Sequence, residues 1–188
     1  MLPPAMSSDV PRVRLATPAD LPALLELIPR SVRGLSRAYY SDAQIEGAIE
    51  HVFGPDTQLI ADGTYFVVEA GSALVGCGGW SRRRTLYGGD QMKGEADPLV
   101  DPALEPARIR AFFVDPGWAR RGIGTALLDA CVGAARAAGF RRLELAATLP
   151  GVPLYRAYGF EPLERIEAPL GEGLGLPIVR MGRAVEVE

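Results

Sequence analysis

With 188 residues, 48% of them hydrophobic and 23% charged, the chain has the size and composition of one compact globular domain, which argues against disorder over its whole length. Its formal net charge of −3 argues against nucleic acid or an anionic membrane as a bulk partner. Cys77 and Cys131 share no CxxC spacing and His51 is the only histidine, so we expect no metal site.

The chain begins with a proline-rich stretch. Residues 1–11 hold three prolines and two serines without a periodic apolar pattern, and we expect a flexible leader there, followed by a single domain over residues 12–188. The start has neither the basic region nor the apolar run of a signal peptide. No segment approaches the roughly 20 apolar residues that span a bilayer. The sequence therefore predicts a cytoplasmic protein with no membrane partner.

The first half of the domain alternates between strand and helix patterns. Apolar residues at helical spacing follow Thr17 and Ser41, and both residues are typical helix N-caps. Two strand patterns flank the turn signal Gly71-Ser72 and predict a hairpin. The expected elements are a strand at Val13–Leu15, a helix from Thr17 to about Val32, a helix from Ser41 to about Gly54, and hairpin strands at Thr64–Glu69 and Ala73–Trp80.

A long stretch without regular pattern follows the hairpin. Residues 82–106 begin with three arginines and contain several glycines and prolines. Irregular loops of this length are uncommon inside a domain and are often functional. We expect this segment to fold over a ligand or to extend the hairpin.

The second half contains a strongly apolar strand and one long helix. The segment Asp115-Pro116-Gly117 ends the strand, and Gly139 ends the helix. The expected elements are a strand at Ile109–Val114, a helix at Gly122–Ala138, a strand at Leu143–Ala147, a short helix at Pro153–Tyr158, and strands at Phe160–Ile166 and Pro177–Val185.

The turn between that strand and the long helix can bind an anion. The first N–H groups of a helix have no partner within the helix and lie at its positive end. Glycines allow a pyrophosphate to approach the backbone closely, and Arg120 and Arg121 add positive charge. By itself the pattern fits a structural turn equally well. It contains no GK[ST] and so is not a P-loop, and it lacks the third glycine and the acidic residue of a dinucleotide site.

The segments on either side of the turn make its functional interpretation more specific. Residues 112–128 resemble motif A of the GNAT acetyltransferase superfamily, in which a hydrophobic strand, V-x-P and [RQ]-x-x-G-x-[GA] precede an apolar helix. Residues 143–148 and 154–160 resemble motif B with its Y-x-x-x-G-F ending. The resemblance covers about residues 12–185. It implies an α/β fold of the α+β type, with a mixed, mostly antiparallel sheet of six to seven strands flanked by about four helices.

The resemblance also implies the cofactor and the reaction. The chain would transfer an acetyl group from acetyl-CoA directly to a primary amine. In the family pattern the strand backbone pairs with the pantetheine and the turn holds the pyrophosphate. Ala119 departs from the [RQ] position, so Arg120 and Arg121 would substitute for that side chain. The residues implied to bind the cofactor are Phe112, Phe113, Val114, Arg120, Arg121, Gly122, Ile123, Gly124 and Thr125.

Acetyl transfer needs a neutral amine, a donor to the oxyanion and a proton or hydrogen bond for the departing thiolate. Tyr155 stands four residues before Gly159, where the family places its acidic tyrosine, and is the candidate for the last role; the alternative is packing beneath the cofactor. Glu69 is the candidate base, with an exposed, solvated carboxylate as the alternative.

Acceptor specificity in this family usually comes from the first helices and the hairpin loop. Tyr40, Trp80 and Arg82 lie there and would bind an acceptor that carries a carboxylate or phosphate, unless the arginine is only a solvated surface residue. The acceptor would be a small molecule or a peptide, and the resemblance admits a homodimer. Two alternatives stay open: a non-catalytic acetyl-CoA-binding regulatory module, and a binder of nucleotides or another phosphate ligand.

Overall fold

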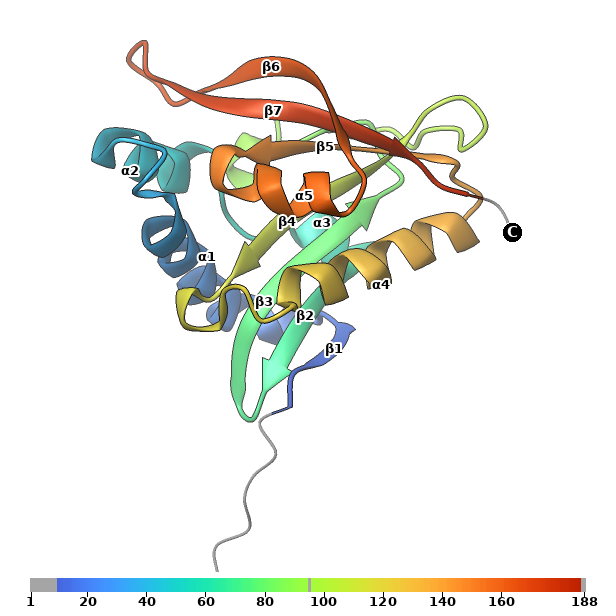
Figure 1. Ribbon diagram of the computed structural model, residues 1–188, viewed down its shortest axis with the longest axis horizontal. Helices are drawn as coiled ribbons and strands as arrows, with labels where there is room; N and C mark the ends of the chain where they lie inside the picture. The colour runs from blue at the N-terminus through green and yellow to red at the C-terminus, as the bar shows by residue number, and fades with distance from the viewer. Residues whose placement is uncertain (1–9, 95, 187–188) are drawn as a thin grey trace, which may run out of the picture.

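The computed structural model describes residues 10–94 and 96–186, and the strands in this part of the chain form one seven-stranded sheet. Their order is β1-β2-β3-β4-β5-β7-β6, from the bottom to the top of Figure 1. Neighbouring strands are antiparallel except β4 and β5, which are parallel. The predicted mixed, mostly antiparallel sheet is therefore confirmed. The strands are β1 (Arg12–Leu15), β2 (Tyr65–Ala70), β3 (Ala73–Ser81), β4 (Ala107–Val114), β5 (Arg142–Thr148), β6 (Glu161–Pro169) and β7 (Gly175–Ala184).

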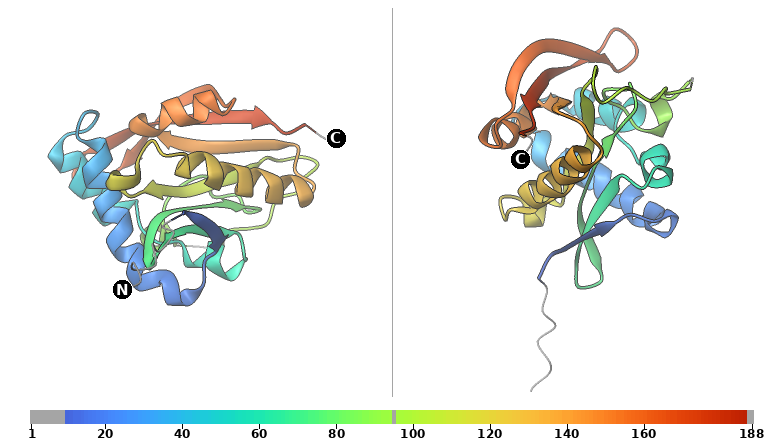
Figure 2. Two further views of the ribbon diagram at one scale, coloured as in Figure 1. Left: turned by 60° about the horizontal axis from the view of Figure 1, so that its bottom comes forward. Right: turned by 90° about the vertical axis from the view of Figure 1, so that its right-hand side faces the viewer.

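Helices cover both faces of the sheet (Figure 2). Within the described residues they are α1 (Leu21–Ser36), α2 (Asp42–His51), α3 (Thr57–Ala61), α4 (Ile123–Ala137) and α5 (Val152–Ala157). The first three contribute buried residues to a core on one face, among them Leu24, Ile45 and Leu59. On the other face Leu128 of α4 and Tyr155 of α5 belong to a second core. The sheet thus separates two apolar layers, and a gap between its strands connects them.

Two predicted helix boundaries were wrong and one helix was missed. Thr17 precedes a 3-10 turn at Pro18–Asp20, so α1 begins only at Leu21 and extends beyond Val32. Helix α3 has five residues, too few to show a periodic pattern. Its one local signal is Asp56, whose side chain caps the helix by accepting a hydrogen bond from the amide of Leu59. Because α3 was not predicted, the described residues contain five α-helices where about four were expected.

The segment 82–106 is more ordered than its composition predicted. It contains a 3-10 turn at Asp90–Met92 and a β-bridge between Arg83 and Leu99. The carboxylate of Asp97 accepts a hydrogen bond from the amide of Thr85 at 2.9 Å, which ties the two ends of the segment together. The leader expected at residues 1–11 lies outside the described residues apart from its last two. In the described part of the chain, no helix combines the length and the apolar character needed to cross a membrane.

Candidate functional site

The middle of the sheet opens between its two parallel strands. β4 pairs with β5 only at Ala107–Leu143 and Arg108–Glu144. Three residues further along β4, Ala111 has a φ of +56°, and the pairing of β4 with β3 shifts between Cys77 and Gly79. This is a β-bulge, which bends a strand away from its regular path. Because β4 bends where it leaves β5, a gap forms between them.

A pocket occupies this gap. Its empty volume is about 550 Å³, part of it open to solvent. Residues 109–113 of β4 form one side, Leu145, Ala146 and Thr148 of β5 form another, and Tyr155 of α5 closes the pocket from the α4 face. Residues 52–54 and 86–89 line it from the opposite face of the sheet. The lining surface is polar and apolar in nearly equal parts, and the lining residues include two that were predicted to bind the cofactor, Phe112 and Phe113.

Tyr155 lies at this pocket, as a catalytic role requires. Its side chain is buried, and its ring contacts Phe112 and Phe160 edge to face at centroid distances of 6.2 and 6.0 Å. Burial raises the pKa of the Tyr155 hydroxyl above its ordinary value. The phenol therefore stays protonated at neutral pH and remains a hydrogen-bond donor.

The glycine-rich turn lies between the end of β4 and the start of α4. Arg120 and Gly122 both have left-handed backbone conformations, with φ of +60° and +83°. A left-handed residue within a turn can bring neighbouring N–H groups to one side and so form an anion-binding concavity. Gly122 caps α4 without a side-chain hydrogen bond, so the first amides of the helix have no side-chain partner. Arg120 and Arg121 are exposed beside them. This end of α4 is suited to an anionic ligand.

Neighbouring elements hold the turn in place. Asp115 accepts a hydrogen bond from the amide of Gly117 at 2.8 Å and pairs with Arg30 of α1 at 2.8 Å. Gly34 of α1 has no Cβ, and one built there would lie 2.2 Å from Cγ of Pro116, so the glycine allows α1 to pack on the turn. The predicted cofactor residue Gly124 similarly makes room for Leu154 of α5. The turn is therefore fixed against helices on both faces of the sheet.

The candidate base Glu69 is not among the residues that line the pocket. It lies on β2 beside the β2–β3 turn, where its carboxylate pairs with Arg14 at 2.8 Å and Arg12 at 3.3 Å. Hydrogen bonds from these arginines hold its pKa below the ordinary value. A carboxylate with a lowered pKa is a weaker base. The geometry therefore does not favour the predicted role of Glu69.

The three predicted acceptor residues do not line the pocket either. Tyr40 is buried, and its hydroxyl donates to the carbonyl of Pro177 at 2.6 Å and accepts from the amide of Leu149 at 2.9 Å. Trp80 is buried against Phe140. The guanidinium of Arg82 stacks on the Trp80 ring at 5.3 Å. All three side chains make contacts within the protein. Residues 52–54 and 86–89 line the pocket where we expected Tyr40, Trp80 and Arg82.

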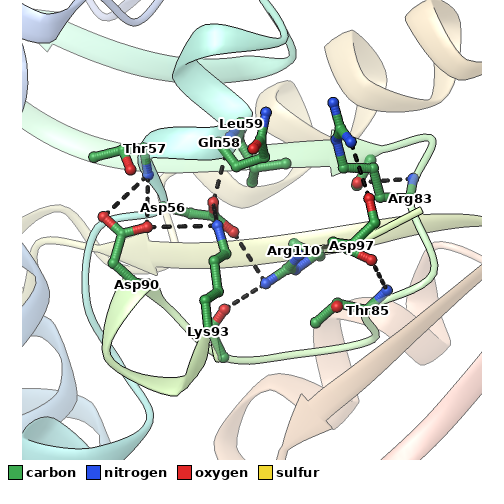
Figure 3. Close-up of polar contacts among 12 residues, drawn as sticks. Asp56, Thr57, Gln58, Leu59, Arg83, Thr85, Asp90, Lys93, Asp97 and Arg110 are labelled. Carbon is green, nitrogen blue, oxygen red and sulfur yellow. Dashed lines mark hydrogen bonds and ion pairs between the residues drawn. The ribbon is translucent and has the colours of Figure 1, made fainter. Parts of the chain in front are cut away.

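A buried ion cluster that the sequence reasoning missed adjoins the pocket (Figure 3). Arg110, a lining residue, is 2% exposed and lies 2.9 Å from the carboxylate of Asp56, which is fully buried. Lys93, the chain's only lysine, also pairs with Asp56 and reaches Asp90 at 3.4 Å. Asp97 lies 3.8 Å from Arg110. Two features of the sequence could have indicated this cluster: the charged residue Arg110 inside an apolar strand, and the single lysine, Lys93, in the segment 82–106.

The cluster ties the segment 82–106 to the floor of the pocket. Buried charges are stable only when they are paired, so each partner depends on the others. Arg110 also donates to the carbonyl of Gly88, a lining residue. Among the described residues, no group of histidine, cysteine, aspartate and glutamate side chains is arranged to hold a metal ion.

The sequence was compared with known families and curated proteins. The model of the family described as the acetyltransferase (GNAT) family matches residues 30–160. This match covers more than half of the 188 residues. No curated protein matches the chain.

Several solved structures have a similar fold. A GCN5-related N-acetyltransferase from Rhodopseudomonas palustris is 20% identical, with a TM-score of 0.69 over 96% of this chain and 99% of its own. The PaiA N-acetyltransferase from Thermoplasma acidophilum, in complex with coenzyme A, is 15% identical, with a TM-score of 0.64 over 94% and 99%. The putative acetyltransferase yncA from Salmonella typhimurium, with its cofactor acetyl-CoA, is 16% identical, with a TM-score of 0.62 over 95% and 96%. These likenesses extend along nearly the whole of each chain.

Proposed function

The chain belongs to the acetyltransferase (GNAT) family, and we propose that it transfers an acetyl group from acetyl-CoA to a primary amine of a small molecule or a peptide. The observation that carries this proposal is the pocket between β4 and β5, with Tyr155 on one side and the glycine-rich turn at the end of β4. A thioester that enters along β4 would have its phosphates at the turn and its carbonyl carbon in the pocket.

The cofactor would be held mainly by backbone groups. The backbone of Phe112, Phe113 and Val114 would pair with the amides of the pantetheine as an added strand does. The turn from Arg120 to Thr125 would bind the pyrophosphate through its N–H groups and two arginines. This assignment is supported by the left-handed residues Arg120 and Gly122, which direct amides to one side.

In the transfer step the neutral amine attacks the carbonyl carbon of the thioester. The carbon–nitrogen bond forms, the carbon–sulfur bond breaks, and the amine loses its extra proton to solvent. An N–H of β4 would stabilise the tetrahedral oxyanion. Tyr155 would donate a proton or a hydrogen bond to the CoA thiolate as it leaves. Its raised pKa makes a hydrogen bond to the thiolate the main contribution.

Thiol release with a panel of primary amines tests the proposal. We expect wild-type protein to release CoA thiol from acetyl-CoA with at least one amine, and acetyl-CoA to raise the melting temperature. Stabilisation by a nucleotide but not by acetyl-CoA would contradict the donor assignment. The panel should contain alkyl amines, amino acids and peptide α-amines, since the pocket lining does not name the acceptor.

One observation favours a second candidate, a non-catalytic acetyl-CoA-binding regulatory module. The described residues that line the pocket include no aspartate, glutamate or histidine that could accept the amine's proton. Such a module would bind acetyl-CoA in calorimetry with an ordinary 1:1 stoichiometry and release no thiol with any amine. The two candidates thus share the binding result and differ only in turnover.

A further inference from the structure

The bulge in β4 contains a conformation that its residue type does not favour. Ala111 has a φ of +56° inside a strand, and alanine rarely adopts this left-handed conformation because its Cβ crowds the backbone. Such a residue persists only where its surroundings hold it, and it tends to lie at functional sites. Ala111 lines the pocket.

Two side chains from neighbouring strands bind the carbonyl oxygen of Ala111. The hydroxyl of Tyr65, on β2, donates to it at 3.2 Å, and the thiol of Cys77, on β3, donates at 3.8 Å. Both side chains are fully buried. Burial raises the pKa of both groups, that of the Cys77 thiol to about 12, so each keeps its proton and remains a donor.

Glycines of β3 make these contacts sterically feasible. A Cβ built at Gly79 would lie 2.8 Å from the ring of Tyr65, so the missing side chain allows the ring to cross β3 and reach β4. A Cβ built at Gly78 would lie 2.6 Å from the ring of Phe112. That ring contacts Tyr155. The bulge is thus held by Tyr65 from one face of the sheet and packs toward the proposed acid on the other.

We propose that Tyr65 is a positioning residue for acetyl transfer, which sets the direction of the peptide group between Ala111 and Phe112. This inference rests on the proposed acetyltransferase function. A peptide unit is planar and trans, so its C=O and N–H point in opposite directions. Holding the Ala111 carbonyl toward the buried Tyr65 hydroxyl therefore also fixes the N–H of Phe112, which we assign to the thioester carbonyl. Tyr65 does not line the pocket and acts through the strand.

The first test compares Tyr65→Phe with the wild type. We expect kcat to fall about tenfold, with less than a twofold change in the KM for acetyl-CoA, because the ring still fills the core while the Ala111 carbonyl keeps only the longer contact from the Cys77 thiol. Tyr158→Phe is the matched control. It also removes one tyrosine hydroxyl bond, to Asp129 at 2.6 Å, but lies away from the bulge, so its kcat should stay within twofold. An unchanged kcat in Tyr65→Phe would overturn the proposal.

The second test is a double-mutant cycle with Ala111→Gly. Glycine adopts a positive φ without strain, so the bulge would no longer need the Tyr65 hydroxyl to the same degree. We expect Tyr65→Phe to cost less than threefold in kcat in the Ala111→Gly background. If Tyr65 acted only through packing, the two effects would be additive and the proposal would be wrong.

A third measurement separates this inference from the proposed function. If the wild type binds acetyl-CoA but releases no thiol with any amine, the proposed activity is wrong. The role of Tyr65 is then tested by amide hydrogen exchange. The amides of Phe112 and Phe113 should then exchange at least tenfold faster in Tyr65→Phe and at the wild-type rate in Tyr158→Phe. Unchanged exchange at both amides would overturn the positioning role whatever the activity.

Discussion

Two buried polar side chains, Tyr155 and Arg110, line the pocket, and their surroundings differ. The ring of Tyr155 packs against two other aromatic rings. The Arg110 guanidinium is surrounded by Asp56 and Asp97, although its Nε has no hydrogen-bond partner among the described residues. A buried donor next to a pocket is available to a ligand, whereas a buried ion pair mainly holds its surroundings in place. The two residues therefore lead to different predictions.

Tyr155→Phe should lower kcat about 100-fold, the lower end of the range for losing one hydrogen-bond donor to a developing anion. The phenyl ring keeps the contacts with Phe112 and Phe160, so the KM for acetyl-CoA should change little. Steady-state kinetics with the best amine of the panel measures both constants. A wild-type kcat would leave Tyr155 with packing alone.

Asp56→Asn should destabilise the protein by about 3–5 kcal/mol, the range for removing one partner of a buried pair. The change leaves Arg110, which is 2% exposed, without its nearest carboxylate and removes the buried partner of Lys93. Asparagine can still cap α3, so the loss isolates the charge. Urea unfolding followed by circular dichroism measures it. Glu46→Gln, in an exposed pair with Arg33, is the control and should change stability little. Equal effects in both variants would contradict the prediction.

At the scale of elements, the turn and α4 act as one unit. The left-handed residues direct the amides of the turn, Gly34 brings α1 against Pro116, and Gly124 brings α5 against the start of α4. Each of these positions is occupied by a small residue or an unusual backbone conformation because elements approach closely there. The anion site depends on this packing as well as on its own sequence.

Gly122→Ala tests the turn directly. A Cβ at Gly122 meets nothing within 4 Å, so its effect would come from the backbone alone, where φ is +83°. We expect a loss of about 1–2 kcal/mol in stability and weaker binding of CoA, because the strained residue rotates its amides away. Calorimetric titration with CoA measures the affinity.

Gly133→Ala provides the matched control on the same helix. Gly133 lies inside α4, and an added Cβ there also meets nothing within 4 Å. Alanine favours a helix, so this variant should gain up to about 1 kcal/mol and bind CoA as the wild type does. Unaltered CoA affinity in Gly122→Ala would argue against the amide cradle.

At the scale of the whole molecule, ion pairs connect one structural element to another. Arg14 of β1 binds Asp20 at 2.7 Å, and Arg83 of the segment 82–106 binds Asp62, just after α3, at 2.7 Å. Hydrogen bonds from these arginines lower the pKa of both aspartates. Their stabilisation is complete above the unfolded pKa, about 3.9, and is lost as pH falls through the lower folded pKa.

We therefore expect the free energy of unfolding to decrease below about pH 4. Asp62→Asn should be less stable than the wild type at pH 7, and the difference should shrink as the pH is lowered toward 2. Urea unfolding across this range measures the difference. A stability difference that is constant with pH would show that Asp62 contributes through packing and not through its charge.

The cytoplasmic location and the homodimer stay predictions.

Much of the fold followed from local patterns. The hairpin, the long helix after Gly122 and the short helix with Tyr155 were predicted from apolar periodicity and turn residues. Both are local signals, because the residues that form each pattern lie within a few positions of one another in the chain. Helix α3 escaped because five residues show no period. Tyr40 and Trp80 were assigned to the acceptor because Tyr40 precedes the second predicted helix and Trp80 ends a hairpin strand, but a linear pattern does not tell which side of an element faces the pocket.

What the sequence alone determined is therefore every strand and every helix except α3, the turn that can bind an anion and the position of Tyr155 along the chain, because each depends on residues close together in the chain. Only the tertiary structure decided that β5 leaves β4 after two pairs, that Arg110 meets Asp56, and that Tyr65 holds the carbonyl of Ala111. These contacts join residues up to 54 positions apart, as with Asp56 and Arg110. The chain acquires them only when burial forces distant polar groups to find partners.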